Sequence, residues 1–304
     1  MGILNMLLPV LAPVLACVGV GYGWARVGAP VDPRQVRAII TNVGTPCLVF
    51  GTLVRLEVPI VALLLVCLVV VLALVCFTAI ALPALRLAGL PASPYLTPLV
   101  FGNLGNMGLP LCFYAFGEVG LELAIAAFAI QSTLFFTLGV WFLSGRTSPR
   151  AALTTPAPWA IGAAVLFLAT GAAPPQWLTN TVELIGGLTI PLMLITLGIT
   201  LARLAIVSVR RTLALSFLRL AMGVAVGLFL VTVLAIEGEA RGVVIILCAM
   251  PSAVFNYLMA LYYDRKPEEV ASLVVAATFL ALVTLPFVVG FAMSEAGLTH
   301  VDIP

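Results

Sequence analysis

The chain is organised as long apolar runs separated by short polar connections, and ten of these runs are candidate membrane spans. A membrane-spanning helix needs about 20 predominantly apolar residues. The runs occupy residues 5–25, 35–55, 59–82, 95–116, 120–143, 158–172, 178–201, 213–236, 242–263 and 269–293. The longest connection between them is residues 144–157, so no soluble domain is expected. The pattern predicts an all-α polytopic membrane protein with ten transmembrane helices.

The composition excludes most soluble functions. Charged residues make up 9% of the chain and apolar residues 63%, whereas about a quarter of an average soluble domain is charged. A soluble enzyme is therefore excluded, and a net charge of +2 gives no reason to expect a nucleic-acid partner. All six cysteines fall within predicted spans, where we interpret them as packing residues. No catalytic or metal-binding motif is found, so we predict no enzyme activity and no cofactor.

The basic residues predict the orientation in the cell membrane, because Lys and Arg concentrate in cytoplasmic connections. With an extracytoplasmic N-terminus, all Lys and Arg residues except Arg55 and Arg241 lie on the cytoplasmic side. An even number of spans then places the C-terminus outside as well. We therefore predict a multi-pass protein with both termini on the extracytoplasmic side.

Similar features recur in the two halves of the chain. The second and seventh spans contain Pro46 and Pro191 at corresponding positions, and both prolines are candidate hinges. Residues 1–147 and 148–304 therefore resemble two copies of a five-span unit. Because five is odd, the second copy enters the membrane from the opposite side, which gives the inverted repeat that alternating access uses. Chance recurrence in a low-complexity apolar sequence is the alternative explanation.

The fourth span is interrupted by helix-breaking and polar residues. These are Gly102, Asn103, Gly105, Asn106, Gly108 and Pro110. Pro251 and Asn256 interrupt the ninth span in the same way. Freed backbone groups cannot face lipid, so both stretches should line a polar cavity near the middle of the membrane. Such paired breaks are typical of a transport site, and half-helix ends can present N–H groups to an anion. The alternative is close helix packing, with asparagine joining helices.

Three further polar side chains lie within the predicted spans. Gln131, in the middle of the fifth span, could reach the same cavity. Glu183, about two turns into the seventh span, is either a proton carrier or a solvated interfacial residue. Arg219, at the cytoplasmic end of the eighth span, is expected to extend along the helix to the membrane surface.

The chain resembles the auxin efflux carrier family, which includes plant PIN-formed exporters and bacterial carriers assigned to malonate or malate. The stretch Asn103–Pro110 matches the family pattern Asn-x-x-x-Met-Gly-[Ile/Leu]-Pro at every fixed position. The resemblance runs nearly end to end. Asn256, where plant members have a second proline, is similar to the bacterial branch. The long central loop of the plant exporters is absent.

The resemblance implies a fold of two inverted five-helix repeats. Spans 1, 2, 6 and 7 would form a scaffold that is often dimeric, so a homodimer is a possible assembly. Spans 3–5 and 8–10 would form a transport domain whose helices 4 and 9 are broken and cross at the membrane midplane. The predicted substrate contacts are Asn103, Asn106, Met107, Pro110, Gln131, Pro251 and Asn256, and the predicted hinges are Gly102, Gly105, Gly108, Pro46 and Pro191.

These observations predict a transporter for a small organic anion, either auxin-like or malonate- or malate-like, that works by alternating access. A sodium-coupled organic-anion symporter of the related bile-acid-carrier fold is the main alternative. A channel and a non-transporting receptor are further alternatives.

Overall fold

The computed structural model describes residues 2–28, 33–55, 58–144, 156–203 and 207–297. These residues are helical throughout, apart from turns and one isolated antiparallel β-bridge. Six helices are long and apolar enough to cross a membrane, and they include Ile60–Leu87, Gln176–Arg203 and Pro267–Glu295. The predicted all-α membrane architecture is therefore confirmed, whereas the ten-span inverted repeat stays a prediction.

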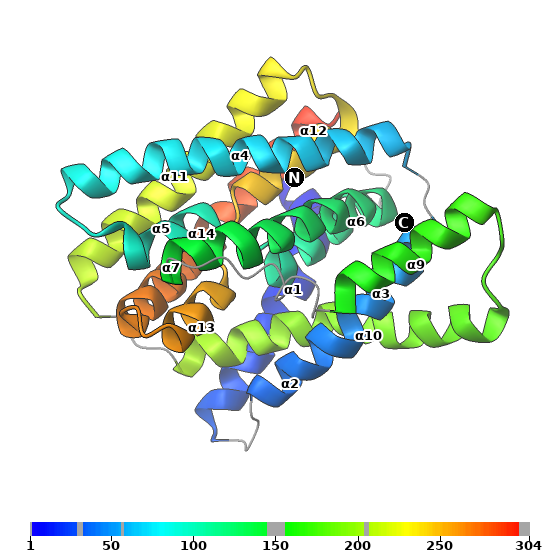
Figure 1. Ribbon diagram of the computed structural model, residues 1–304, viewed down its shortest axis with the longest axis horizontal. Helices are drawn as coiled ribbons and strands as arrows, with labels where there is room; N and C mark the ends of the chain where they lie inside the picture. Colours follow the sequence, from blue (N-terminus) through cyan, green and yellow to red (C-terminus); the bar gives the residue numbers. More distant parts are fainter. Residues whose placement is uncertain (1, 29–32, 56–57, 145–155, 204–206, 298–304) are drawn as a thin grey trace.

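The helices follow one another along the chain with short connections (Figure 1). The first half contains α1 (Gly2–Arg26), α2 (Pro33–Ile39), the π-helical turn η1 (Ile40–Gly44), α3 (Thr45–Leu53), α4 (Ile60–Leu87), α5 (Ala92–Val100), η2 (Leu104–Gly108), α6 (Leu109–Leu134), η3 (Phe135–Gly139) and α7 (Val140–Ser144). The second half contains α9 (Pro156–Thr170), α10 (Gln176–Arg203), α11 (Val209–Val233), α12 (Gly238–Cys248), α13 (Val254–Tyr262) and α14 (Pro267–Glu295).

The chain turns back within α6 at Gly117, which has φ 61° and ψ −148°. A Cβ on Gly120 would overlap the carbonyl oxygen of Cys112. A straight helix would place two residues eight apart at a separation of about 12 Å. The reversal therefore ends one helical segment and begins another, between the predicted fourth and fifth spans. Position 117 favours glycine, because a backbone with this positive φ is strained for any residue with a side chain.

The helices pack in two groups. In the first group α10 packs along α1 and α3, and α3 packs against α9. In the second group α4, α5, α6, α11, α12, α13 and α14 pack on one another. In Figure 1, α4 runs across the upper part of the view and α10 across the lower part. The helices that bear the two breaks, α5, α6, α12 and α13, all belong to the second group.

Small residues let α1 and α10 approach closely. A Cβ on Gly21 would overlap the backbone of Ile195, and a Cβ on Gly198 would overlap the backbone of Val18. Such close contact of backbones is the usual way in which helices associate in lipid, because lipid supplies no hydrophobic driving force between them. Gly23, two residues after Gly21, has nothing within 4 Å of its Cβ position.

We expect Gly21→Ala to destabilise the protein by about 1–3 kcal/mol, because the added methyl group forces the two helices apart. The matched change Gly23→Ala should be neutral or stabilising by up to about 1 kcal/mol, because alanine favours helix. The measurement is the thermal unfolding midpoint of each purified variant in the same detergent. Equal midpoints for the two variants would contradict the close α1–α10 contact.

Candidate functional site

The two helix breaks pair with each other. The backbone N–H of Asn103 donates to the carbonyl of Pro251 at 2.7 Å, and the N–H of Ala253 donates to the carbonyl of Phe101 at 3.2 Å. Gly102 and Ser252 face one another between these two bonds as an antiparallel bridge. Each break thus supplies hydrogen-bond partners that the other lost when its helix ended. Both interruptions predicted from the sequence are present, and the two broken helices cross at them.

The local sequence accounts for where the helices end and restart. Phe101 has an extended backbone, with φ −96° and ψ 107°, so α5 ends directly before it. The Asn103 side chain then caps the next helical segment, because its Oδ1 accepts from the backbone N–H of Asn106 at 3.3 Å. Pro110 lies in the first turn of α6, where a missing N–H has little cost.

Two predicted substrate contacts instead support the crossing. The Asn256 amide nitrogen donates to the carbonyls of Phe101 at 3.1 Å and Ala253 at 3.0 Å, and to the Ser252 hydroxyl at 3.2 Å. The Gln131 amide nitrogen donates to the carbonyl of Gly102 at 2.8 Å. Asn256 is fully buried. These side chains join α13 and α6 to the crossing backbone, so their first role is to hold it in place.

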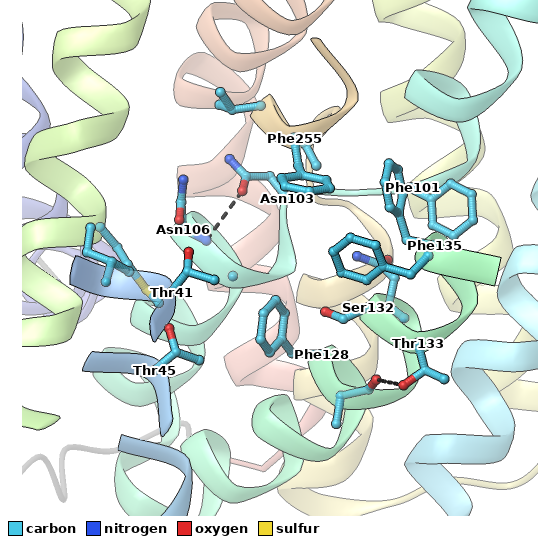
Figure 2. Close-up of a pocket in the computed structure, with 18 of the residues that line it drawn as sticks. Thr41, Thr45, Phe101, Asn103, Asn106, Phe128, Ser132, Thr133, Phe135 and Phe255 are labelled. Atoms are coloured by element: carbon cyan, nitrogen blue, oxygen red, sulfur yellow. Dashed lines mark hydrogen bonds between the residues drawn. The ribbon is translucent and has the colours of Figure 1, made fainter. Parts of the chain in front are cut away.

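A cavity of about 220 Å³ lies against the crossing (Figure 2). It is bounded on one side by the first helix group and on the other by the breaks and the second half of α6. Its lining residues are Ile40, Thr41, Thr45, Val49, Phe101, Gly102, Asn103, Gly105, Asn106, Phe128, Ala129, Gln131, Ser132, Thr133, Phe135, Phe136, Pro158, Ile161, Met193, Thr196, Ala253, Val254 and Phe255. No charged side chain belongs to this lining.

The predicted contacts divide between the cavity and the packing around it. Asn103, Asn106 and Gln131 line the cavity, as do the predicted hinges Gly102 and Gly105. The other predicted contacts and the remaining glycine hinge are buried and lie outside the lining, namely Met107, Pro110, Pro251, Asn256 and Gly108.

Two buried polar atoms at the cavity have no hydrogen-bond partner within the described residues. They are the amide nitrogen of Asn103 and the hydroxyl of Thr196, and both residues line the cavity. Because Oδ1 of Asn103 is held by the N–H of Asn106, the orientation of its amide nitrogen is fixed. A buried donor without a partner costs about 1–3 kcal/mol. A bound ligand that accepts from both groups would remove that cost.

An aromatic wall faces these polar groups. The ring centroid of Phe135 lies 4.9 Å from that of Phe101 and 5.2 Å from that of Phe255. The ring centroids of Phe136 and Phe255 are 5.4 Å apart. All four rings line the cavity. Figure 2 shows Thr41 and Thr45 on one side of it and Phe101 and Phe135 on the other. The cavity therefore combines polar side chains with several aromatic rings.

The remaining candidates lie elsewhere. Glu183 forms an ion pair with Arg55 and lines a second cavity of about 460 Å³, together with Glu118 and Glu122. Its role as a proton carrier stays a prediction. Pro46 follows the π-helical turn η1, whereas Pro191 lies inside α10, which continues without interruption.

The prediction that Arg219 reaches the membrane surface is wrong. The residue is 1% exposed, and its guanidinium carbon lies 4.6 Å from the centroid of the Phe77 ring. Arg219 is on the face of α11 that packs against α4 and α12, so its side chain points into the protein. The sequence position near a helix end suggested the surface, and only the packing of α11 shows otherwise.

Sequence reasoning also missed Thr196 and the phenylalanine wall. Thr196 sits in the apolar α10, where a lone threonine usually bonds its own helix backbone. The phenylalanines come from the break after α5, from η3 and from α13, and they meet only in the fold. The one available signal was the pair Phe135–Phe136, which follows the polar run Gln131–Thr133.

Comparison with known proteins gives the same class of function. A family model described as "Membrane transport protein" matches residues 143–289. An uncharacterized transporter from Methanothermobacter thermautotrophicus is 28% identical over 286 residues, which cover 90% of this chain and 94% of that protein. The second half of the chain is therefore similar to this membrane transport family. Both matches support the family resemblance predicted from Asn103–Pro110, and the apolar helices support a multi-pass membrane protein.

We expect Asn256→Ala to lower the stability of the protein by about 1–3 kcal/mol, because it removes the buried hydrogen bonds from the Asn256 amide to the carbonyls of Phe101 and Ala253. The matched control is Asn180→Ala, an exposed asparagine on α10, which should change stability by less than about 0.5 kcal/mol. Thermal unfolding of the purified variants measures both. If Asn256→Ala is as stable as the control, Asn256 does not hold the crossing.

Proposed function

We propose that this protein transports a small organic anion across the cell membrane by alternating access, and that the anion binds in the cavity beside the crossing. The observation that carries this proposal is a pair of buried groups without a hydrogen-bond partner among the described residues, the Asn103 amide nitrogen and the Thr196 hydroxyl, which line the same cavity. Asn103 belongs to the crossing and Thr196 to α10. A substrate held by both would bridge the two helix groups, between which it has to move.

The electrostatics of the cavity favour an anion. The first turns of two helical segments reach the cavity, at Gly105 and Asn106 after the first break and at Val254 and Phe255 after the second. Helix N-termini carry partial positive charge and present free N–H groups. No carboxylate belongs to the lining. A carboxylate can accept from these N–H groups and from the Asn103 amide, so an organic acid is the expected substrate.

The aromatic wall favours a substrate with an apolar body. Phe101, Phe135 and Phe255 would contact the part of the molecule that does not carry the carboxylate. A malonate- or malate-like substrate would place a second carboxylate against these rings. The cavity volume of about 220 Å³ is below the range of about 300–1,000 Å³ that is usual for drug-sized ligands. We therefore favour a small, auxin-like monocarboxylate.

The arrangement of the two cavities suits alternating access. Both lie between α3, α6 and α10, at different levels along these helices. α10 lines the second cavity between Val182 and Pro191, and the first with Met193 and Thr196. In our proposal the group containing α1, α3, α9 and α10 is the scaffold, and it forms the homodimer that the family resemblance implies. The second group is the transport domain, and it moves the crossing between the two levels.

This proposal keeps the predicted topology of ten spans in two inverted repeats, with both termini extracytoplasmic. The sodium-coupled alternative has one specific observation in its favour. The side-chain amide oxygen of Asn256 (Oδ1) is buried and has no donor within the described residues. Such an oxygen is a suitable ligand for a hard cation. Flux that requires sodium, and that is lost when choline replaces it, would favour this second candidate.

We expect Asn103→Ala to reduce carboxylate flux by about tenfold or more, because a charge-assisted hydrogen bond to the substrate is lost. The variant also loses the cap that Oδ1 of Asn103 gives to the N–H of Asn106, at a cost of about 1 kcal/mol, so flux is compared per amount of folded protein. The test is uptake of indole-3-acetate, malonate and malate into proteoliposomes, with Asn180→Ala as the control variant. Equal flux through Asn103→Ala and wild type would remove Asn103 from the substrate site.

We further expect net flux of a monocarboxylate to respond to membrane potential, since one charge crossing 100 mV gains about 2.3 kcal/mol. Potassium gradients with valinomycin set the potential, and indole-3-acetate uptake is measured at each value. Flux that does not change with potential would show that the anion does not cross the membrane alone. It would indicate electroneutral coupling to protons or sodium.

A further inference from the structure

Arg219 is a buried cation with no acidic partner in the described part of the chain. One terminal nitrogen donates to the carbonyl of Cys248 at 3.4 Å, and its Nε has no hydrogen-bond partner. The guanidinium also rests on the Phe77 ring. The ion pairs found in the described residues involve other arginines, such as Arg211 with Glu269. A charge enclosed in this way is costly unless something compensates it.

The protein itself compensates part of this charge. Cys248 is the last residue of α12, so its carbonyl belongs to the helix end that carries partial negative charge. The face of Phe77 adds a weaker attraction. A helix end contributes about half an elementary charge at most. A full positive charge therefore remains only partly balanced beside the crossing.

The guanidinium lies directly behind the cavity wall. The second terminal nitrogen would be 2.6 Å from a Cβ on Gly102, and Gly102 lines the cavity. The other neighbours of that Cβ position are Leu104 and the carbonyl of Met250. Gly102 thus lies next to the Arg219 guanidinium and also lines the cavity. The absence of a side chain at Gly102, predicted as a hinge, makes room for the arginine.

We propose that Arg219 is the fixed counter-charge for the transported anion and acts on it across Gly102 without touching it. This inference rests on the proposed function and deepens it. Under this proposal the site selects its substrate by negative charge as well as by hydrogen bonding. Because the helix end of α12 balances part of Arg219, less than one full positive charge remains for the substrate to balance. A monoanion therefore fits better than a dianion.

A purely structural role for Arg219 makes a different prediction. If the arginine served only to tether the end of α12, an apolar replacement would weaken the empty protein and affect all ligands equally. A counter-charge is a burden to the empty protein, because replacing a buried charge by an apolar residue is often neutral or stabilising. Its removal should harm the binding of anions and spare neutral analogues.

The experiment compares Arg219→Met, Arg219→Lys and the control Arg210→Gln, which removes an exposed arginine from the same helix. Ligand-induced thermal stabilisation of the purified full-length protein is titrated with indole-3-acetate and its neutral analogue indole-3-acetamide, and with malonate and malonamide. We expect Arg219→Met to bind indole-3-acetate about tenfold more weakly or worse, with the amide changed by less than about twofold. Arg219→Lys should retain most of the affinity, and Arg210→Gln all of it. The empty Arg219→Met protein should unfold at or above the wild-type temperature.

The outcomes separate the two proposals. If wild type binds none of these acids, the proposed function fails, and the counter-charge fails with it. If wild type binds an acid and Arg219→Met binds it equally well, or loses acid and amide alike, the counter-charge alone fails. Should Arg219→Met not fold, Gly102→Ala is the second variant, because its methyl group would displace the guanidinium. Unchanged affinity of Gly102→Ala for the acid would then overturn the counter-charge.

Discussion

Backbone hydrogen bonding without water is the constraint on which this structure depends. A helix that stops inside an apolar protein leaves several N–H and carbonyl groups without partners. Here two helices stop, and each break uses the other: the N–H of Asn103 meets the carbonyl of Pro251, and the N–H of Ala253 meets that of Phe101. Neither break would be tolerable alone. The crossing is therefore one cooperative unit, and every other feature of the site is arranged around it.

The pairing leaves the two new helix starts free to act on a ligand. The backbone groups of Phe101 and Asn103 already form hydrogen bonds with the second break. The N–H groups that follow them in the chain are therefore not required to join the two breaks. Asn256 and Gln131 fix the crossing from two sides. This rigid support is what allows the Asn103 amide to stay unpartnered in a fixed orientation. A preorganised donor of this kind binds an anion without first having to order itself.

Much of this architecture was predictable from the sequence. The apolar runs give the helices, because lipid requires length and hydrophobicity that the sequence displays directly. The breaks at Gly102–Pro110 and Pro251 were also predictable, since Gly and Pro act through local backbone geometry. What could not be predicted depends on packing between distant helices. The burial of Arg219 is set by the face of α11 that meets α4 and α12, and Thr196 gains its meaning only from the cavity beside it.

The two asparagines show how similar sequence signals acquire different roles. Asn103 and Asn256 both lie at a break, and both looked like substrate contacts. Asn256 turns its amide nitrogen toward the crossing backbone and donates there, whereas Asn103 caps its own helix through oxygen and its nitrogen has no partner among the described residues. Arg219 adds to this asymmetry, because it stands behind Gly102 in the first break. The two breaks are thus structurally alike but chemically distinct. The Asn103 donor lies in the first break and Arg219 lies next to it, whereas the second break mainly holds the first in place.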